Sequence, residues 1–372
     1  MMRRFSVAFT LLLACAAPGP AAPGNSTSPQ VAPSRPRLHP TAPLSTVVFG
    51  SCLDQSRPHP ILGDVVAADP DLVVLLGDNV YADAGVEADL ERAYAGLGDS
   101  PGFRRMSAAA PILAVWDDHD YGRNDVGKEF ELKEASKRIM LDFFAEPADS
   151  PRRQRPGNYD AVVVGPPGQR VQLLLLDTRW FRDPLRAGGS SRRYLPHEES
   201  GPTVLGEAQW TWLEARLREP ADVRFLVTSI QLEVDEHPFE GWGLFPAERR
   251  RMFDLIASTG AGGVVVVSGD RHRGELSCAF DPGIGYPLLE LTASALNRPN
   301  YNLEDNRFRR PGAPLIGDEN FGLVKVDWSH RTLSIGLHGI GGVVHFTSEV
   351  SLDALQPGRG ISGVADCHAL NQ

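Results

Sequence analysis

This sequence of 372 residues lacks several features that would assign it to a common class. It has no long block of lysine or arginine and its formal net charge is −10, so no nucleic-acid-binding surface is evident. It has no fixed-period repeat, which excludes a repeat array. Its amino-terminal apolar run is too short to span a bilayer comfortably. Its hydrophobic share of 42% is ample for the core of one compact α/β domain.

The amino-terminal segment has the pattern of an export signal. Met1–Arg4 is a short basic region, and Phe5–Ala14 is the apolar region that follows it. Leu12–Cys15 resembles a bacterial lipoprotein box, in which Cys15 becomes the lipidated first residue of the mature protein. Ordinary cleavage is the alternative, because Ala14–Ala16 fits an A-x-A pattern. We favour lipidation and expect an exported protein, either a membrane-anchored lipoprotein or a periplasmic or extracellular one.

Composition divides the chain into four segments. Residues 1–15 form the signal. Residues 16–44 are rich in Pro, Ala, Ser and Thr, cannot bury a core, and are expected to form a disordered tether. Residues 45–350 form the folded domain, and residues 351–372 form a C-terminal tail.

Cysteine is scarce, with four residues in the chain. Cys15 belongs to the signal, and Cys52 follows a predicted strand. Cys278 and Cys367 remain, and an exported protein can pair them in a disulfide. Two free buried thiols are the alternative, because the sequence does not give the distance between these residues.

Apolar runs alternate with amphipathic segments, which is typical of an α/β fold. Strands are expected at 46–49, 72–76, 112–116, 159–164, 171–176, 223–228 and 263–268. Helices are expected at 61–68, 86–97, 129–144, 207–217 and 247–258. After Asp270 only strands are expected, at 276–280, 288–291, 321–326 and 332–337. The long insertion Arg182–Val204 is basic and rich in Gly and Ser, and connections of that length are usually functional or mobile.

Five short polar clusters each follow one of these apolar runs. They are Gly50–Cys52, Gly77–Tyr81, Trp116–Asp120, Asp177–Arg179 and Gly269–His272. In an α/β sheet the strand ends are where loops gather to form a site. The clusters supply a thiol, a phenol, carboxylates, imidazoles and guanidinium groups. This set is typical of metal ligation and anion binding rather than of core packing.

The second and third clusters have the chemistry of a metal site. Asp78 and Tyr81 can aim a carboxylate and a phenol at one point, and a phenol becomes a ligand when a strong Lewis acid binds it. Closely spaced carboxylates in Asp117–Asp120 repel one another unless cations relieve the repulsion. His119 can protonate a leaving oxygen, with Asp120 as its orienting partner. The alternatives are a tyrosine packed over a turn and a solvated acidic loop.

The other clusters are weaker when taken singly. Asp270 and His272 alternate by two, so in extended chain both can reach one ion, although a surface Asp-Arg-His is the more common case. Cys52 alone is more often a buried core thiol. Arg179 is either a salt-bridge partner or, in a metal cleft, the planar fork that holds a phosphate. The placement of each cluster after its own strand favours one shared site.

With these motifs in this order, the chain resembles the alkaline phosphatase D branch of the calcineurin-like metallophosphoesterases, from about Val47 to about Leu296. The resemblance is carried by Phe49–Cys52 and the four later clusters, while Gln209–Leu213 and Trp242–Arg250 are similar to the shorter members of that family. It implies a four-layer α-β-β-α sandwich with two mixed sheets between helices. It also implies a multinuclear metal centre at the strand ends.

The resemblance further implies roles for particular residues. A ferric ion would be held by Cys52, Asp78 and Tyr81. This site and a neighbouring one for calcium or another divalent ion would be completed by Asp118, Asn124, Asp270 and His272. Asp117 is the alternative to Asp118. The related enzymes have a metal-binding histidine after a middle strand, but Ser229–Gln231 has none, so the shell of the second metal is left open.

The implied function is hydrolysis of phosphate monoesters or diesters through attack by a metal-bound hydroxide. Arg179 would neutralise the phosphoryl oxygens and His119 would protonate the leaving group. Small phosphate esters or lipid head groups are the expected substrates. A phospholipase-like diesterase is one alternative, and a non-catalytic lipoprotein that binds phosphate or a polyanion is another. The joint presence of a thiol, a phenol and an imidazole argues against the non-catalytic alternative.

Overall fold

The computed structural model describes residues 36–189, 192–359 and 367–369. The expected signal and most of the expected tether lie outside these ranges. The part of the tether that is described, residues 36–44, packs against the body: Leu44 is buried, and the Pro40 carbonyl accepts a hydrogen bond from the Gly165 amide at 2.9 Å. Within the described ranges, none of the helices combines the length and the apolar character that crossing a membrane requires.

The first sheet is mixed and has six strands in the order β14-β13-β12-β1-β2-β3. Its strands are β1 (Thr46–Gly50), β2 (Leu72–Leu76), β3 (Ile112–Val115), β12 (Phe321–Asp327), β13 (Thr332–His338) and β14 (Val344–Ser351). The three strands β1, β2 and β3 are parallel neighbours, whereas β12, β13 and β14 extend the sheet in antiparallel fashion from β1.

The second sheet is also mixed and has seven strands in the order β15-β10-β11-β9-β8-β5-β4. Its strands are β4 (Asp160–Val164), β5 (Val171–Leu175), β8 (Val223–Val227), β9 (Val264–Ser268), β10 (Gly274–Phe280), β11 (Pro287–Ala293) and β15 (His368–Ala369). Its centre, from β5 through β8 and β9 to β11, is parallel. Every residue of β5, β8, β9 and β11 is buried, as expected for parallel strands covered on both faces.

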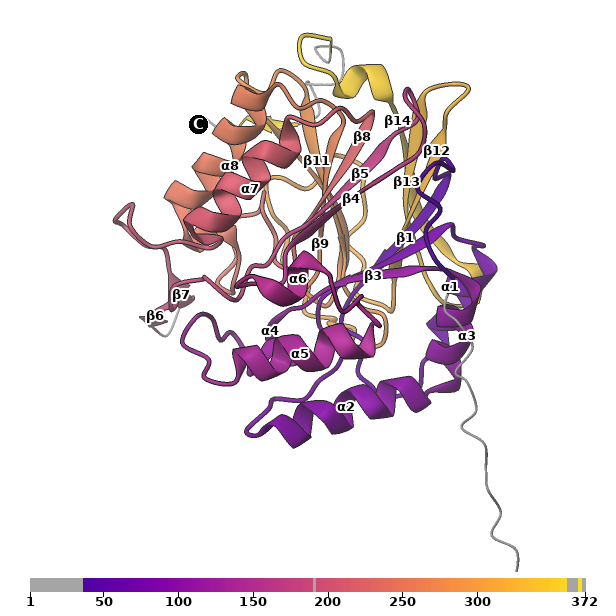
Figure 1. Ribbon diagram of the computed structural model, residues 1–372. Coiled ribbons are helices and arrows are strands. Elements are labelled where there is room, and N and C mark those ends of the chain that lie inside the picture. The colour runs from indigo at the N-terminus through magenta and orange to yellow at the C-terminus, as the bar shows by residue number, and fades with distance from the viewer. Residues whose placement is uncertain (1–35, 190–191, 360–366, 370–372) are drawn as a thin grey trace, which may run out of the picture. The chain divides into compact units, whose positions relative to one another are not determined.

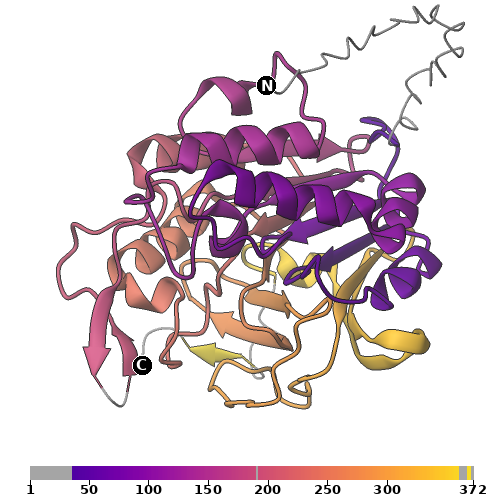
Figure 2. The ribbon, with the colours of Figure 1, turned by 90° about the horizontal axis from the view of Figure 1, so that it is seen from below.

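Helices cover the outer face of each sheet. On the side of β1–β3 lie α1 (Ile61–Ala67), α2 (Glu87–Asp99), α3 (Pro101–Ala109) and α5 (Lys133–Phe143). On the side of the second sheet lie α7 (Gly206–Leu217) and α8 (Pro246–Thr259), next to each other (Figure 1). The view from below shows α2 and α5 running side by side (Figure 2). The four-layer sandwich with mixed sheets is thereby confirmed.

Alternation along β1 explains why this strand separates two apolar cores. Val47 and Phe49 belong to the core between the sheets, and Phe49 stacks against Phe225 of β8 with ring centroids 5.0 Å apart. Val48 points the other way and belongs to the core beneath the helices. Successive side chains of a strand point to opposite faces, so one apolar strand serves both cores.

Shorter elements connect these layers. They are α4 (Asp118–Tyr121), α6 (Pro151–Gln154), β6 (Arg186–Gly189), β7 (Arg192–Leu195), η1 (Trp242–Leu244), η2 (Ile340–Gly342) and η3 (Leu352–Leu355). The long insertion predicted at Arg182–Val204 contains the antiparallel β6–β7 hairpin. The segment expected as a C-terminal tail contributes η3, whose residues Leu352 and Leu355 are buried.

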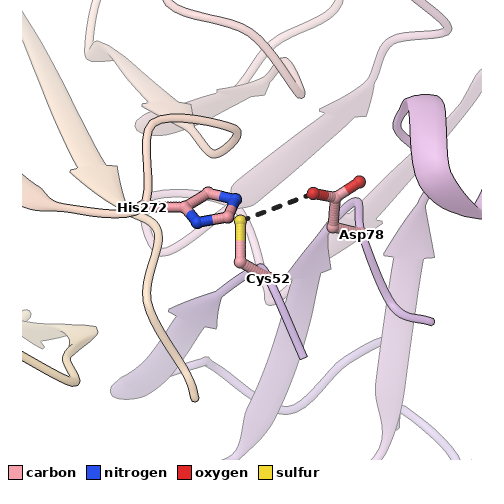
Figure 3. Close-up of side chains that lie close together, drawn as sticks. All are labelled: Cys52, Asp78 and His272. Atoms are coloured by element: carbon pink, nitrogen blue, oxygen red, sulfur yellow. Dashed lines mark hydrogen bonds between the residues drawn. The ribbon is translucent and has the colours of Figure 1, made fainter. Parts of the chain in front are cut away.

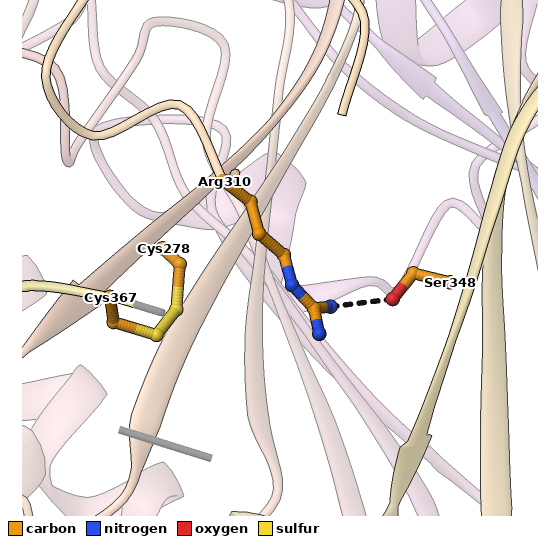
Figure 4. Close-up of a disulfide and its surroundings, with 4 residues drawn as sticks. All are labelled: Cys278, Arg310, Ser348 and Cys367. Atoms are coloured by element: carbon orange, nitrogen blue, oxygen red, sulfur yellow. Dashed lines mark hydrogen bonds between the residues drawn. A yellow bond between two sulfur atoms is a disulfide. The ribbon is translucent and has the colours of Figure 1, made fainter. Parts of the chain in front are cut away.

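A disulfide joins Cys278 of β10 to Cys367, next to β15, so the pairing alternative holds (Figure 4). It secures the two-residue strand β15 at the edge of the second sheet. In the same region Arg310 bridges the two sheets: its amide donates to Leu276 of β10, and its guanidinium donates to the Ser348 hydroxyl of β14 at 2.5 Å.

Candidate metal centre

Loops from both sheets meet at the candidate centre. Cys52, Asp78 and Asp118 follow β1, β2 and β3 in the first sheet, and Asp270 and His272 follow β9 in the second. Ligand loops that are far apart in the sequence are joined by main-chain contacts, among them a hydrogen bond from the Cys52 amide to the Gly77 carbonyl. The strand-end clusters therefore do lie together, as their shared position after strands predicts.

The first group of side chains surrounds one carboxylate oxygen. Cys52, Asp78 and His272 each offer a ligand atom, and these atoms lie within 4.8 Å of one another (Figure 3). The Cys52 sulfur lies 3.6 Å from Asp78 Oδ2. The Tyr81 hydroxyl donates to the same oxygen at 2.7 Å and lies 3.2 Å from His272 Nε2. A thiol, a phenol, an imidazole and a carboxylate thus converge.

Asp118 links the remaining groups of possible ligands. It lies within the same 4.8 Å limit of three pairs: Asp78 with His119, Asp117 with Asp270, and Asp125 with Glu240. Its two oxygens also accept hydrogen bonds from the amides of His119 at 2.9 Å and Asp125 at 2.6 Å. Asp118 therefore lies between the group that contains the Cys52 thiol and the group in which Asp125 and Glu240 offer only carboxylate oxygens.

Backbone strain is concentrated at the candidate ligands. Cys52, Asp78, Asp270 and His272 have φ angles of 58°, 50°, 65° and 54°. A non-glycine residue in this region costs of order 1–3 kcal/mol, and it persists only where the surrounding structure imposes it. The glycine before Asp78 is required as well, because a Cβ on Gly77 would lie 2.5 Å from the Asp117 side chain. The surrounding structure therefore holds these four residues in an unfavourable backbone conformation that brings their side chains together.

The electrostatics of the centre favour added positive charge. Burial, followed by the neighbouring Asp118, raises the pKa of Asp78 well above its usual value. Burial and Asp117 act in the same way on the pKa of Asp270, and burial raises the pKa of the Cys52 thiol to about 11. The pKa of Asp118 is lowered to about 2, because the Arg179 charge and hydrogen bonds outweigh its burial.

The residues of the candidate centre have the chemistry to hold a cation. The buried Asp117 Oδ2 has no hydrogen-bond partner among the described residues, and an unpaired carboxylate oxygen in a low-dielectric site is costly. Carboxylates are the oxygen ligands that Ca²⁺ and other hard cations take, while the thiol, phenol and imidazole suit a transition metal. The donor set therefore matches two different kinds of ion side by side.

Arg179 has a position different from the one a phosphate-binding fork would need. Its side chain is 0% exposed. Its Nε donates to Asp117 Oδ1 at 2.7 Å, and its Nη1 donates to Glu240 Oε2 at 2.6 Å. The salt-bridge alternative describes these contacts, so we treat Arg179 as a residue that positions Asp117 and Glu240 rather than one that contacts substrate.

Asn124 and His119 lie at the edge of the centre. Asn124 is exposed, and its amide donates to Asp125 Oδ2 at 2.6 Å. The His119 ring packs on the Tyr81 ring with centroids 4.4 Å apart, and its Nδ1 lies 2.7 Å from Asp83 Oδ1. The orienting partner of His119 is therefore Asp83, not Asp120, whose carboxylate accepts from the Asp117 and Asn79 amides instead.

Sequence reasoning missed four residues of the site. They are Asp83, Asp125, Glu240 and Ser294. The sequence did contain a signal for Asp125, because this residue extends the acidic loop that carries Asn124. Glu240 lies in a loop well beyond β8, two residues before the family-like segment Trp242–Arg250, and that nearness was a signal that could have pointed to it. Ser294, whose hydroxyl lies 3.2 Å from the Cys52 sulfur, was hidden because β11 continues to Ala293, two residues beyond the predicted strand.

The comparison with known families now identifies the class of the protein. The family model of the PhoD-like phosphatases matches residues 48–319, which is well over half of the chain. The chain therefore belongs to the PhoD-like phosphatase family. The matched region runs from β1 to just before β12 and includes every candidate ligand described above.

Individual relatives agree with this assignment. Alkaline phosphatase D of Bacillus subtilis (strain 168) is 24% identical over an alignment 271 residues long, which covers 62% of this chain and 46% of that protein. The chain thus spans about half the length of the curated relative it matches. The solved structure of PhoD has a TM-score of 0.66 at 18% identity, covering 86% of this chain and 70% of that one. GAP50, the anchor in the inner membrane complex of Plasmodium, has a TM-score of 0.52 at 10% identity, with 83% and 89% covered. These two structures share the fold.

Proposed function

We propose that this protein is a metal-dependent phosphoric ester hydrolase that cleaves phosphate monoesters or diesters. The observation that carries the proposal is the convergence of Cys52, Asp78, Tyr81 and His272 around one point, from loops of two sheets. Membership of the PhoD-like phosphatase family supports the same reaction class. Small phosphate esters, or the phosphate head groups of lipids, are the substrates that suit such a centre.

Two kinds of cation are assigned to the centre. A ferric ion would be held by Cys52, Asp78, Tyr81 and His272. A calcium ion, or another divalent ion, would be held on the oxygen-rich side by Asp118, Asn124 and Asp270. Asp125 and Glu240 lie within reach of Asp118, and they would supply oxygen ligands in the shell that lacks the family's histidine. When bound, such cations act as Lewis acids that lower the pKa of water and neutralise phosphoryl charge.

The chain's own residues then have separable tasks. Asp78 would be a ligand common to both cations, because its carboxylate belongs both to the group with Cys52 and His272 and to the group with Asp118 and His119. His119 stands at the rim with its Nδ1 held by Asp83, which leaves Nε2 to protonate the leaving oxygen of the ester or stabilise its charge. Hydrogen bonds from Arg179 fix the orientation of the Asp117 and Glu240 carboxylates. Each role depends on the position of one side chain and can be tested by substituting that residue.

The central test combines metal analysis with two substrates. Purified protein should contain iron and a divalent ion, absorb visible light through its phenolate–iron bond, and hydrolyse p-nitrophenyl phosphate or bis-p-nitrophenyl phosphate. The ratio of the two rates separates monoester from diester use. Colourless, inactive protein that still binds phosphate would instead support the non-catalytic alternative.

Asp78→Asn should abolish hydrolysis while leaving the fold intact, because the shared carboxylate charge is lost. Asp99→Asn is the matched control: Asp99 has an 81% exposed side chain and pairs with Arg104 on the surface, so its variant should keep wild-type activity. An Asp78→Asn enzyme with activity within about tenfold of wild type would contradict the assignment, since a bridging metal ligand cannot be dispensable.

We also propose that the protein is exported and held at a membrane by a lipid on Cys15, with simple cleavage nearby as the alternative. The Cys278–Cys367 disulfide supports export, because such bonds persist in oxidising compartments. Cell fractionation of wild type and Cys15→Ser distinguishes the outcomes. Wild type in the membrane fraction with Cys15→Ser released supports lipidation, and wild type in the cytoplasm contradicts export.

A further inference from the structure

The segment Ser294–Arg298 is fastened between two ligand loops. The Leu296 amide donates to the Ser51 carbonyl at 3.0 Å, and the Asn297 amide donates to the Cys52 carbonyl at 3.3 Å. The Ser294 hydroxyl accepts the His272 amide at 2.8 Å. The backbone that carries Arg298 is therefore fixed relative to both the Cys52 loop and the His272 loop.

The Arg298 guanidinium lies over a candidate ligand. Its Cζ is 4.0 Å from the centroid of the Tyr81 ring, and the hydroxyl of that ring contacts both Asp78 and His272. The Arg298 side chain is 30% exposed, so part of it is accessible to solvent beside the Tyr81 ring.

The charge of Arg298 is only partly neutralised by its own partner. Its Nη1 lies 3.0 Å from Asp54 Oδ2. The same oxygen lies 3.2 Å from the Nε of Arg57, and the other oxygen of Asp54 accepts from the Ser56 hydroxyl at 2.6 Å. One carboxylate thus serves two guanidinium groups, so Asp54 by itself does not neutralise both charges.

We propose that Arg298 is a substrate-binding residue whose guanidinium contacts the phosphoryl oxygens of the ester. The inference rests on the proposed hydrolase function and deepens it. Asp54 and the Tyr81 ring hold the guanidinium plane in place, so little conformational freedom is lost when it binds an anion. Arg298 then has the task that the buried Arg179 cannot perform, and it lies outside every motif that carries the family resemblance.

The test measures the binding of inorganic phosphate by titration calorimetry, in parallel with the hydrolysis of both p-nitrophenyl esters. Arg298→Gln should weaken phosphate binding by about tenfold or more, because a charge-assisted hydrogen bond is lost. Its KM should rise and its metal content should stay at the wild-type value. Arg298→Lys should restore part of the affinity, since it restores charge but not the planar fork.

Arg57→Gln is the matched control, because Arg57 shares the Asp54 carboxylate and has a 49% exposed side chain. Its phosphate affinity should fall much less than that of Arg298→Gln, because only a neighbouring charge is removed, and a loss equal to that of Arg298→Gln would overturn the proposal. Unchanged affinity in Arg298→Gln, with wild type binding phosphate normally, would overturn the role of Arg298 alone. A wild-type protein that neither binds phosphate nor cleaves an ester would overturn the proposed function as well.

Discussion

Four candidate ligands of this centre have a left-handed backbone: Cys52, Asp78, Asp270 and His272. Asp78 and Asp270 could be selected by their position after strands, but their left-handed backbone and their raised pKa values depend on neighbours from other strands. Arg179 illustrates the limit: a guanidinium after a strand end predicts either an anion fork or a salt bridge. Only the positions of Asp117 and Glu240 decide between these two roles.

The contact between Asp83 and the His119 ring can be tested by substitution. Asp83→Ala should lower kcat by about ten- to a hundredfold, because it removes the group that orients the His119 ring. Asp83→Asn keeps an acceptor oxygen and should lose less. The readout is the pH profile of kcat for both variants, which a purely structural role of this exposed side chain would not change. An Asp83→Ala profile that superimposes on the wild-type profile would show that His119 needs no such partner.

Among the secondary-structure elements, buried apolar strands were predicted well and elements without an apolar signature were not. The strand β2 was predicted with its observed bounds, Leu72–Leu76, because all five residues are buried and apolar. The exposed edge strand β14 was missed, because half of its residues face solvent. The helix α3 was missed despite a Ser-Pro start, in which Ser100 caps the amide of Phe103.

A disulfide attaches the small edge strand β15 to its sheet. Its two residues pair with Ala279 and Phe280 of β10, and the disulfide closes a chain separation of 89 residues. Reduction should lower the free energy of unfolding by about 2–4 kcal/mol, since a bond across so long a loop restricts the unfolded chain. Urea unfolding with and without reductant measures the difference.

The control for that experiment is the double variant Cys278→Ser/Cys367→Ser. It should match the reduced wild type and show no further response to reductant, because the remaining thiol in the described part of the chain, Cys52, is free. Identical midpoints for oxidised and reduced wild type would contradict the expected stabilisation by the disulfide.

For the described body of the protein, the candidate centre is a seam between the two sheets. Strand ends of the first sheet supply Cys52, Asp78 and Asp118, and the end of β9 supplies Asp270 and His272. The order of the motifs predicted that seam, because each cluster follows its own strand. The contributions of Glu240 and Arg298 could not be predicted in this way, because they come from long loops whose paths depend on the assembled sandwich.

The seam also couples cation binding to global stability, and this coupling can be measured. Asp78, Asp117 and Asp118 are at most 2% exposed, and the partly buried Asp270 lies beside Asp117 and Asp118, so removal of bound cations leaves several carboxylates facing one another. Thermal unfolding with chelator should therefore begin at a lower temperature than with metal restored. An ion present at 100 times its Kd contributes about 2.7 kcal/mol by mass action.

Asp270→Asn separates this coupling from unspecific effects of the chelator. Without metal the variant should be more stable than metal-free wild type, because one of the mutually repelling carboxylates is gone. With metal it should be less stable than loaded wild type, since a ligand is missing. The surface variant Asp99→Asn should follow wild type in both conditions. If chelator leaves the unfolding temperature of wild type unchanged, the carboxylates at the seam are stable without a cation, and the argument that ties their burial to metal binding fails.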